Sequence, residues 1–413
     1  MSVASRVRSA LPPRFAEPAG GRPRVAQPHV RPPLWTVHRT LWALVALGGA
    51  GIVAAWFLAG AQRFWVNWLM WLVFMVCLAL GALFLVALQH MTGARWSVPL
   101  RRTAERIAAL TPWLVPVAAI ALFSLPVVFS WTQPDAASIT PLVLKEHWLN
   151  RPFFIIRLAV CLGLWVLSYV VLVRGSVRQD VTKDPSLTVR LRRFSPVFMI
   201  LLALTITDFA FDWVSALEAS WYSDIFGVYL FAGAVTTAIA ATLLAVMHLQ
   251  RRGRLPGVTG DHVYNLGGLL FGFTIFWAYI AFSQYLLQWY ADLPAEVFWY
   301  VQRTSGPMGL VFVLLGVGHF FVPFLALMSR ADKKSPTRLK WVAIWVIFME
   351  FVDVFWLISP IQGGGIRLGW PEVSFAAFFV AAGLLVIRRA LSLGEDMPTG
   401  DPFLAAGLDF HLR

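Results

Sequence analysis

The sequence predicts an all-α integral membrane protein whose chain crosses the bilayer ten times. Hydrophobic residues make up 59% of the 413 residues and charged residues only 13%, whereas about a quarter of the residues in ordinary soluble domains are charged. The mean hydropathy of +0.70 points the same way. Ten apolar segments are long enough to cross a hydrocarbon layer of about 30 Å as helices. The predicted spans are residues 41–60, 64–88, 110–131, 153–174, 194–215, 223–247, 264–287, 305–328, 338–359 and 373–390.

The positive charge indicates how the chain is oriented, and it does not require a nucleic-acid partner. Twenty-eight of the 34 lysines and arginines lie in the N-terminal tail, in alternate loops and at the C-terminal end, and only five lie in the loops of the opposite side. Positively charged loops remain in the cytoplasm. We therefore expect both termini to be cytoplasmic.

Three parts of the chain differ in composition. Residues 1–40 contain seven arginines and seven prolines and have no long apolar run, which predicts a disordered basic tail near anionic lipid headgroups. Residues 41–392 form the ten-helix membrane domain. Residues 393–413 form a short cytoplasmic C-terminal tail. The tail of residues 1–40 lacks a small-residue cleavage site, so we expect the first span to anchor the chain.

Four carboxylates lie inside two of the predicted spans. Asp208 and Asp212 are four residues apart, and Glu350 and Asp353 are three residues apart, so each pair shares one face of a helix. A charge near the bilayer centre costs at least about 2.5–3.5 kcal/mol, so such groups face a bundle interior, a partner or a proton path. The pairs could handle protons or could be satisfied structural ion pairs.

Other polar side chains are arranged by depth around these acids. His319 lies near mid-membrane, four residues before Pro323, where the missing amide should kink the eighth span. A polar cluster that could bind a quinol is predicted toward the outer side, and a group for proton uptake is predicted at the cytoplasmic mouth. The polar cluster comprises Arg157, Gln284 and Tyr285 toward the outer side and Tyr279 at greater depth, and the cytoplasmic group comprises His90, His248, Asp261 and His262.

Cysteine and histidine usage argues against a redox cofactor or a metal on this chain. Cys77 and Cys161 cannot supply an iron–sulfur cluster, and no Cys-x-x-Cys-His motif marks covalent haem. A bis-histidine haem needs two histidines at similar depth, and only His319 lies near mid-membrane. The step from Gly268 to Gly272 predicts close approach of another helix to the seventh span.

Several stretches resemble the NrfD-type membrane subunits of alternative complex III, most closely the ActF-like members. One runs from Thr207 to Tyr229 and begins Thr-Asp-Phe-Ala-Phe-Asp-Trp. Another runs from Asn265 to Tyr300 and includes Phe-Trp-Ala-Tyr-Ile-Ala-Phe-Ser-Gln-Tyr. Shorter similarities cover residues 90–97, where Arg95 replaces a residue that is small in the family, and residues 319–324.

The resemblance implies two four-helix bundles plus two peripheral helices, in a bacterial cytoplasmic (inner) membrane. It implies a quinol-oxidising respiratory complex with a homologous NrfD-like membrane subunit, an iron–sulfur subunit and a multihaem cytochrome c subunit. Haem c and the iron–sulfur clusters would then belong to those partners, and the better-supported quinol site to the homologous subunit. For this chain it implies a scaffold and a proton pathway through Asp208, Asp212, His319, Glu350 and Asp353.

Two other functions remain open from the residues. The chain could bind its own quinol near Arg157, Gln284 and the outer aromatic side chains. It could instead be a stand-alone ion or solute transporter, because the two acid pairs stand in corresponding positions of a weak internal repeat. Co-purifying haem and iron–sulfur subunits would distinguish a complex from a transporter.

Overall fold

The computed structural model describes residues 35–134, 143–363, 365–392 and 394–412. All regular secondary structure in these residues is helical. Ten helical segments are long and apolar enough to cross a membrane, which confirms the predicted number of spans. Most segments extend beyond the predicted boundaries because polar residues continue the helices past the apolar stretch.

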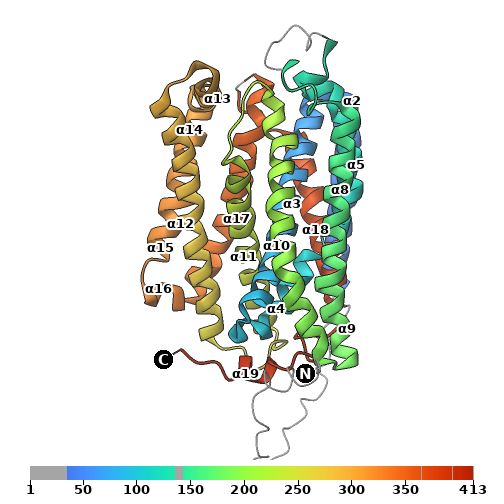
Figure 1. Cartoon of the computed structure of the whole chain (residues 1–413), viewed down its shortest axis with the longest axis vertical. Helices are drawn as coiled ribbons and strands as arrows, with labels where there is room; N and C mark the ends of the chain where they lie inside the picture. The colour runs from blue at the N-terminus through green and yellow to red at the C-terminus, as the bar shows by residue number, and fades with distance from the viewer. Residues whose placement is uncertain (1–34, 135–142, 364, 393, 413) are drawn as a thin grey trace, which may run out of the picture.

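The spans follow one another along the chain as long, roughly parallel rods (Figure 1). The first two spans are α2 (Trp35–Leu58) and α3 (Ala61–Thr92). The third consists of α4 (Val98–Ala108), α5 (Leu114–Ala121) and α6 (Leu125–Val128) in succession. The fourth consists of α8 (Arg151–Tyr169) and α9 (Gly175–Thr182), and the fifth contains α10 (Pro185–Trp213). The last five contain α11 (Phe226–Arg251), α12 (Gly260–Ala291), the segment of α14 (Gly306–Leu314) and α15 (Val322–Ala326), α17 (Pro336–Ile358) and α18 (Trp370–Leu391).

Short helices mark the two ends of the molecule. The helix α13 (Pro294–Thr304) lies at one end, and α19 (Leu404–Leu408) lies at the other, with α16 (Arg330–Lys334) nearer the α19 end (Figure 1). We refer to these as the α13 end and the α19 end. The charge distribution predicts that the α19 end faces the cytoplasm.

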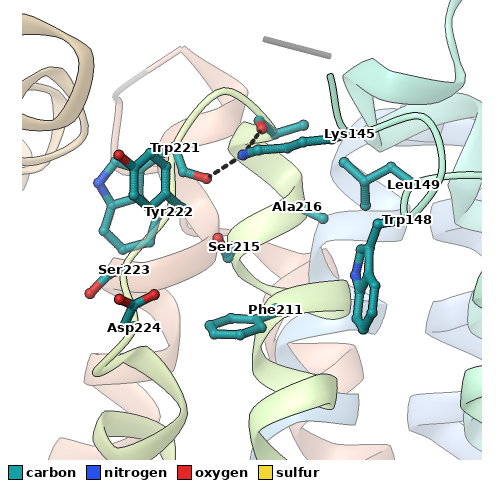
Figure 2. Close-up of a pocket in the computed structure, with 11 residues that line it drawn as sticks. Lys145, Trp148, Leu149, Phe211, Ser215, Ala216, Trp221, Tyr222, Ser223 and Asp224 are labelled. Carbon is teal, nitrogen blue, oxygen red and sulfur yellow. Dashed lines mark hydrogen bonds between the residues drawn. The ribbon is translucent and has the colours of Figure 1, made fainter. Parts of the chain in front are cut away.

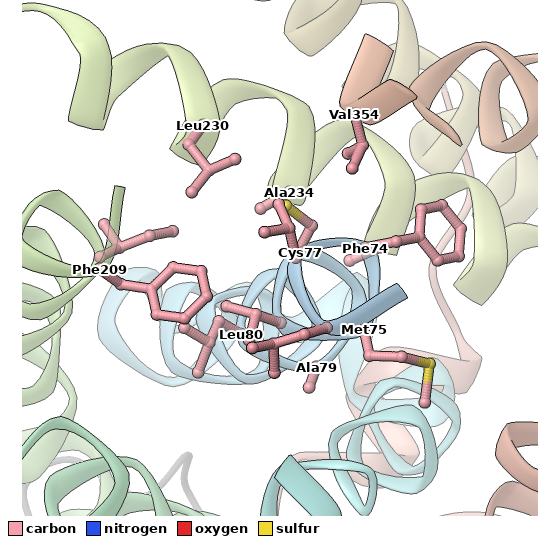
Figure 3. Packing of buried hydrophobic residues seen from close by; sticks show 14 of the residues in the cluster. Phe74, Met75, Cys77, Ala79, Leu80, Phe209, Leu230, Ala234 and Val354 are labelled. Carbon is pink, nitrogen blue, oxygen red and sulfur yellow. The ribbon is translucent and has the colours of Figure 1, made fainter. Parts of the chain in front are cut away.

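The helix α3 forms the centre of the packing. It contacts α10, α11, α17 and α4, and nearly all of its residues from Phe64 to His90 are buried. Figure 3 shows Cys77 and Leu80 of α3 among side chains of α10, α11 and α17. A Cβ atom on Gly81 would lie 2.0 Å from the Ala234 carbonyl oxygen, so α3 and α11 approach closely only because this residue is glycine.

The first and last spans pack along each other. The backbone of α2 at Gly48 and Gly51 lies against Phe378 and Ser374 of α18. Few residues of α2 are buried by the rest of the chain: Leu41, Ile52 and Ala55 are the buried hydrophobic residues that the structure describes on this helix. The helix therefore exposes most of its apolar surface.

Two local expectations concern the eighth and seventh spans. Before Pro323, the eighth span contains a π-helical segment, Leu315–Phe321, and this segment carries His319. π-helical turns occur frequently at functional sites. The expectation for Gly268 and Gly272 is wrong for the described part of the chain, because no atom of another described helix lies within 4 Å of a Cβ atom placed on either glycine.

The C-terminal tail packs across the α19 end of the bundle. Asp396 pairs with Arg106 of α4 at 2.8 Å and with Arg254, which follows α11, at 2.5 Å. Asp401 pairs with Arg101 of α4 at 2.5 Å, and both side chains are buried. The tail therefore connects helix ends that are far apart in the sequence.

Candidate functional site

Three ionisable side chains meet in the interior of the bundle and form what we call the His–Glu–Asp centre. His319 comes from the π-helical segment, and Glu350 and Asp353 come from adjacent turns of α17. Their relative exposures are 0%, 1% and 2%. The Nε2 atom of His319 lies 3.7 Å from Oε2 of Glu350. These residues were three of the five predicted members of the proton pathway.

Two aromatic residues that the sequence analysis did not assign to the site hold Asp353. The Tyr229 hydroxyl of α11 donates to Oδ1 at 2.5 Å, and the Trp277 indole N–H of α12 donates to Oδ2 at 3.2 Å. The Trp277 ring also lies against the His319 ring. Hydrogen bonds from both donors stabilise the ionised form of Asp353. Tyr229 and Trp277 lie within the stretches that resemble the family, which was the only signal for them.

Glu350 fits against the α11 backbone because residue 233 is glycine. A Cβ atom on Gly233 would lie 2.4 Å from Oε1 of Glu350. Helix α11 contacts both α12 and α17. The glycine therefore lets the carboxylate lie directly against the central helix.

The centre retains unused hydrogen-bonding capacity. Both ring nitrogens of His319 and Oε2 of Glu350 have no hydrogen-bond partner among the described residues, and all three atoms are buried. Most buried polar groups are paired, so such atoms mark a place for water, an ion or a transferable proton. One ligand atom from each acidic or imidazole side chain lies within 4.8 Å of the others, so the three residues could also hold a divalent cation.

The other two predicted pathway residues belong to a second group, the Arg–Asp cluster, between α8 and α10. Arg157 binds both oxygens of Asp212, with Nε–Oδ2 and Nη2–Oδ1 distances of 2.8 and 2.7 Å. Its Nε lies 3.4 Å from Oδ1 of Asp208. The Cys161 thiol donates to Oδ2 of Asp208 at 3.3 Å. Asp212 is thus held in a bidentate ion pair, whereas the Asp208 side chain is 19% exposed.

The four residues predicted to form a quinol-binding cluster do not meet. The hydrogen bonds and ion pairs of Arg157 go to Trp148, Asp208 and Asp212. Tyr279 is 65% exposed on the surface of α12. Gln284 is buried near Tyr300, and the Tyr285 ring packs on the Tyr300 ring at 5.3 Å. Gln284 and Tyr285 therefore adjoin the same tyrosine, whereas Arg157 and Tyr279 lie apart from them, so the structure does not bring the four together.

The predicted group for proton uptake is also dispersed. His248 is exposed, whereas His90 is buried and its Nε2 has no partner in the described part of the chain. His262 is buried and both ring nitrogens have contacts. Its Nδ1 accepts the Thr259 amide N–H, and its Nε2 lies 2.9 Å from the Gly407 carbonyl oxygen. Asp261 accepts the Leu412 amide N–H at 3.2 Å. The C-terminal tail therefore covers His262 and Asp261 and gives them structural contacts.

A pocket with a volume of about 340 Å³ lies beside the Arg–Asp cluster at the α13 end, and we call it the end pocket (Figure 2). Its walls are mostly apolar and come from the end of α10, the turn that follows it and the segment before α8. The lining residues include Lys145, Trp148, Phe211, Ser215, Tyr222 and Asp224. Tyr222 and Asp224 are exposed, so the pocket opens to the surface.

Lys145 fastens the segment before α8 to the end of α10. Its Nζ donates to the carbonyl oxygens of Ala219 at 2.6 Å and Trp221 at 3.1 Å (Figure 2). Partial burial lowers the pKa of the Lys145 ammonium, because desolvation disfavours the charged form. The lysine is therefore a structural tether and not a free surface cation.

Comparison of the sequence with models of known protein families and with curated proteins gives no match. A functional assignment therefore depends on the residues themselves and on the geometry of the two buried groups.

Proposed function

We propose that this chain is a membrane subunit of a quinol-oxidising respiratory complex of the alternative complex III type, and that it provides a scaffold and a proton pathway coupled to quinol oxidation. The observation that carries the proton pathway is the His–Glu–Asp centre. It places three ionisable groups within a membrane-spanning bundle, fully enclosed, with unused hydrogen-bonding capacity on His319 and Glu350.

The centre can hold and release one proton between its two carboxylates and its imidazole. Two adjacent carboxylates in a low-dielectric interior resist being ionised together, so one of them keeps a proton. Tyr229 and Trp277 already donate to Asp353 and favour its anion. Glu350 accepts no comparable pair of donors, so we assign the exchangeable proton to Glu350, with His319 as its neighbour at 3.7 Å.

The Arg–Asp cluster supplies a second station nearer the α13 end. One arginine facing two aspartates leaves a formal charge of −1, which a proton can neutralise. Asp212 is committed to Arg157, so Asp208 is the better candidate for the group that exchanges the proton. The pathway therefore consists of two stations, and α11 contacts both α10 and α17, which carry them.

The resemblance supports the rest of the assembly. We propose that the spans group as two four-helix bundles with α2 and α18 at the periphery, and that both termini are cytoplasmic in a bacterial inner membrane. The partners would be a homologous NrfD-like subunit, an iron–sulfur subunit and a multihaem cytochrome c subunit, which would carry the redox cofactors. The pairing of α2 with α18 is consistent with this grouping.

Neutral substitutions in the assembled complex test the proposal. Glu350→Gln should abolish proton release coupled to quinol oxidation, measured with a pH indicator in vesicles containing the complex. Asp292→Asn is the matched control, because Asp292 is exposed and asparagine tolerates its left-handed backbone. The same proton yield per quinol in Glu350→Gln as in the control would refute the proton pathway. Purification without haem and iron–sulfur partners would refute the complex.

The end pocket favours quinol binding by this chain as a second candidate function. Its apolar and aromatic walls suit a quinol ring, and Trp148 connects its wall to Asp212. The prediction is that quinone remains bound to the purified chain and is lost on Ala216→Trp, which fills the pocket. Quinone content that does not change in this variant would exclude the pocket.

A further inference from the structure

Trp148 belongs to both the end pocket and the Arg–Asp cluster. Its indole N–H donates to Oδ1 of Asp212 at 3.2 Å, and its ring lies under the Arg157 guanidinium, with 4.2 Å from Cζ to the ring centroid. The same side chain lines the pocket, whereas Arg157 and Asp212 do not. The indole therefore separates the ion pair from the pocket.

The Trp148 ring covers the Arg157 guanidinium together with the rings of Phe153 and Phe154, and of these three side chains Trp148 lines the end pocket. Asp212 and Arg157 are 2% and 7% exposed, whereas Trp148 is 42% exposed. The Trp148 carbonyl oxygen accepts Nη1–H of Arg157 at 2.9 Å. Movement of the side chain alone thus opens a route while the backbone contact with Arg157 remains.

The segment that carries Trp148 is tethered at one point on its other side. Lys145, three residues earlier, binds the Ala219 and Trp221 carbonyl oxygens at the far wall of the pocket. This tether fixes the position of the Trp148 indole relative to the opposite wall of the pocket. It also makes Lys145 a second position from which the indole can be displaced.

Cys161 can report whether reagents reach the Arg–Asp cluster. Cys161 is one helical turn from Arg157 on α8 and donates to Asp208. The chain has only two cysteines, and the other, Cys77, is fully buried on α3 near α11 and α17. Reaction of Cys161 with a charged thiol reagent therefore measures access to the Arg–Asp cluster, and Cys77 reports loss of the fold.

We propose that Trp148 is the gate between the end pocket and the Arg–Asp cluster, so that water from the extracytoplasmic side passes through the end pocket to Asp212 only when the indole moves. Trp148 does not itself exchange a proton in this proposal. Its indole N–H holds the Asp212 carboxylate in place. The side of the membrane from which the gate opens and the species that passes it, a proton carried by water, rest on the proposed function.

The test uses spheroplasts that contain the complete complex and a membrane-impermeant methanethiosulfonate added from outside, with labelling measured by peptide mass spectrometry. A closed gate is open for about 0.1–10% of the time, so Trp148→Ala should raise the Cys161 labelling rate by about tenfold or more. Trp148→Phe keeps the ring over Arg157 but loses the N–H bond to Asp212, and should give a smaller increase. Cys77 should remain unlabelled in every variant.

A second substitution identifies the route. Ala216→Trp fills the end pocket and, combined with Trp148→Ala, should return Cys161 labelling to the wild-type rate. Equal Cys161 labelling in the wild type and Trp148→Ala would overturn the gate, as would labelling that persists after the pocket is filled. Labelling of Cys77 together with Cys161 would show that Trp148→Ala has lost the fold. Lys145→Met, which removes the tether and keeps the indole, is then the deciding variant, and Cys161 labelling at the wild-type rate in it would overturn the gate. Cys161 labelling needs no quinol, so the two proposals are tested separately. The labelling results can refute the gate while Glu350→Gln still abolishes proton release, and Glu350→Gln can refute the proton pathway while the labelling results still support the gate.

Discussion

The rings of His319 and Trp277 lie 3.9 Å apart between centroids, with an angle of 34° between their planes. The same indole donates to Asp353. One side chain of α12 therefore positions the imidazole of a π-helical segment and the carboxylate of α17. This shared contact keeps two groups from different helices in one centre although no hydrogen bond joins them.

Replacing the indole tests this role directly. Trp277→Phe keeps an aromatic ring against His319 but removes the donor to Asp353. We expect the free energy of unfolding to fall by about 1–3 kcal/mol, because a buried carboxylate loses a hydrogen bond. Proton release per quinol should also fall. Thermal unfolding of the purified complex and the vesicle assay measure the two effects, and an unchanged melting temperature would argue against the bond.

Glycine at position 233 is required for the site. In Gly233→Ala, the new Cβ atom would displace the Glu350 carboxylate, so we expect a loss of about 1–3 kcal/mol from overpacking and a reduced proton yield. Gly272→Ala is the matched control on α12, because a Cβ atom there meets nothing within 4 Å. The control should leave stability equal or slightly increased. Equal behaviour of the two variants would show that Glu350 can move freely.

The Arg–Asp cluster should behave as a strongly coupled buried pair. Arg157→Met leaves two carboxylates without their cation and should destabilise the protein by about 3–5 kcal/mol. Adding Asp212→Asn should recover part of this loss, because one uncompensated charge is removed. Additive effects in the double-mutant cycle would contradict the coupling. Arg151→Met, at an exposed position of the same helix, serves as the control.

The C-terminal tail should contribute to stability through its buried ion pairs. Asp401→Asn leaves Arg101 with Glu105 at 3.4 Å as its remaining carboxylate partner. We expect a cost of about 3–5 kcal/mol, because one partner of a buried pair is lost. Asp409→Asn changes an exposed aspartate of the same tail and should be neutral. Equal melting temperatures for the two variants would show that the tail is only loosely attached.

Lys145 should give a stability effect that grows with pH. Burial lowers its pKa in the folded chain from the ordinary value of 10.5. Between these two pKa values the unfolded state binds more protons than the native state, so the contribution of Lys145 to the free energy of unfolding rises with pH. The melting temperature of the wild type minus that of Lys145→Met should therefore increase as the pH rises toward 10.5. Lys334→Met, at an exposed position, should show no such trend.

The spans could be predicted from the sequence because apolar length is a local property of the chain. The order of the polar residues by depth, which assumes a constant rise per helical residue, remains a prediction. The direction of each side chain around its helix could not be predicted. Tyr279 and Gln284 are five residues apart, so they point to different sides of α12, and only Gln284 is buried.

Contacts between distant parts of the chain account for the other differences. His262 lies 145 residues from Gly407, to which it binds, and nothing local indicates that the C-terminal tail returns to it. The five predicted pathway residues, four acids and one histidine, divide between α10 on one side and the His–Glu–Asp centre on the other. Charge and depth identified these residues, but which of them meet depends on helix packing.

The central position of α3 has a consequence for how the protein is made. This helix leaves the ribosome second, yet the backbone against which Gly81 packs, at Ala234, is synthesised about 150 residues later. During that interval, lipid or the insertion machinery must occupy the surface that α11 will cover. Maturation therefore requires this temporary neighbour to be expelled, and a larger residue at position 81 would keep α11 from taking its place against α3.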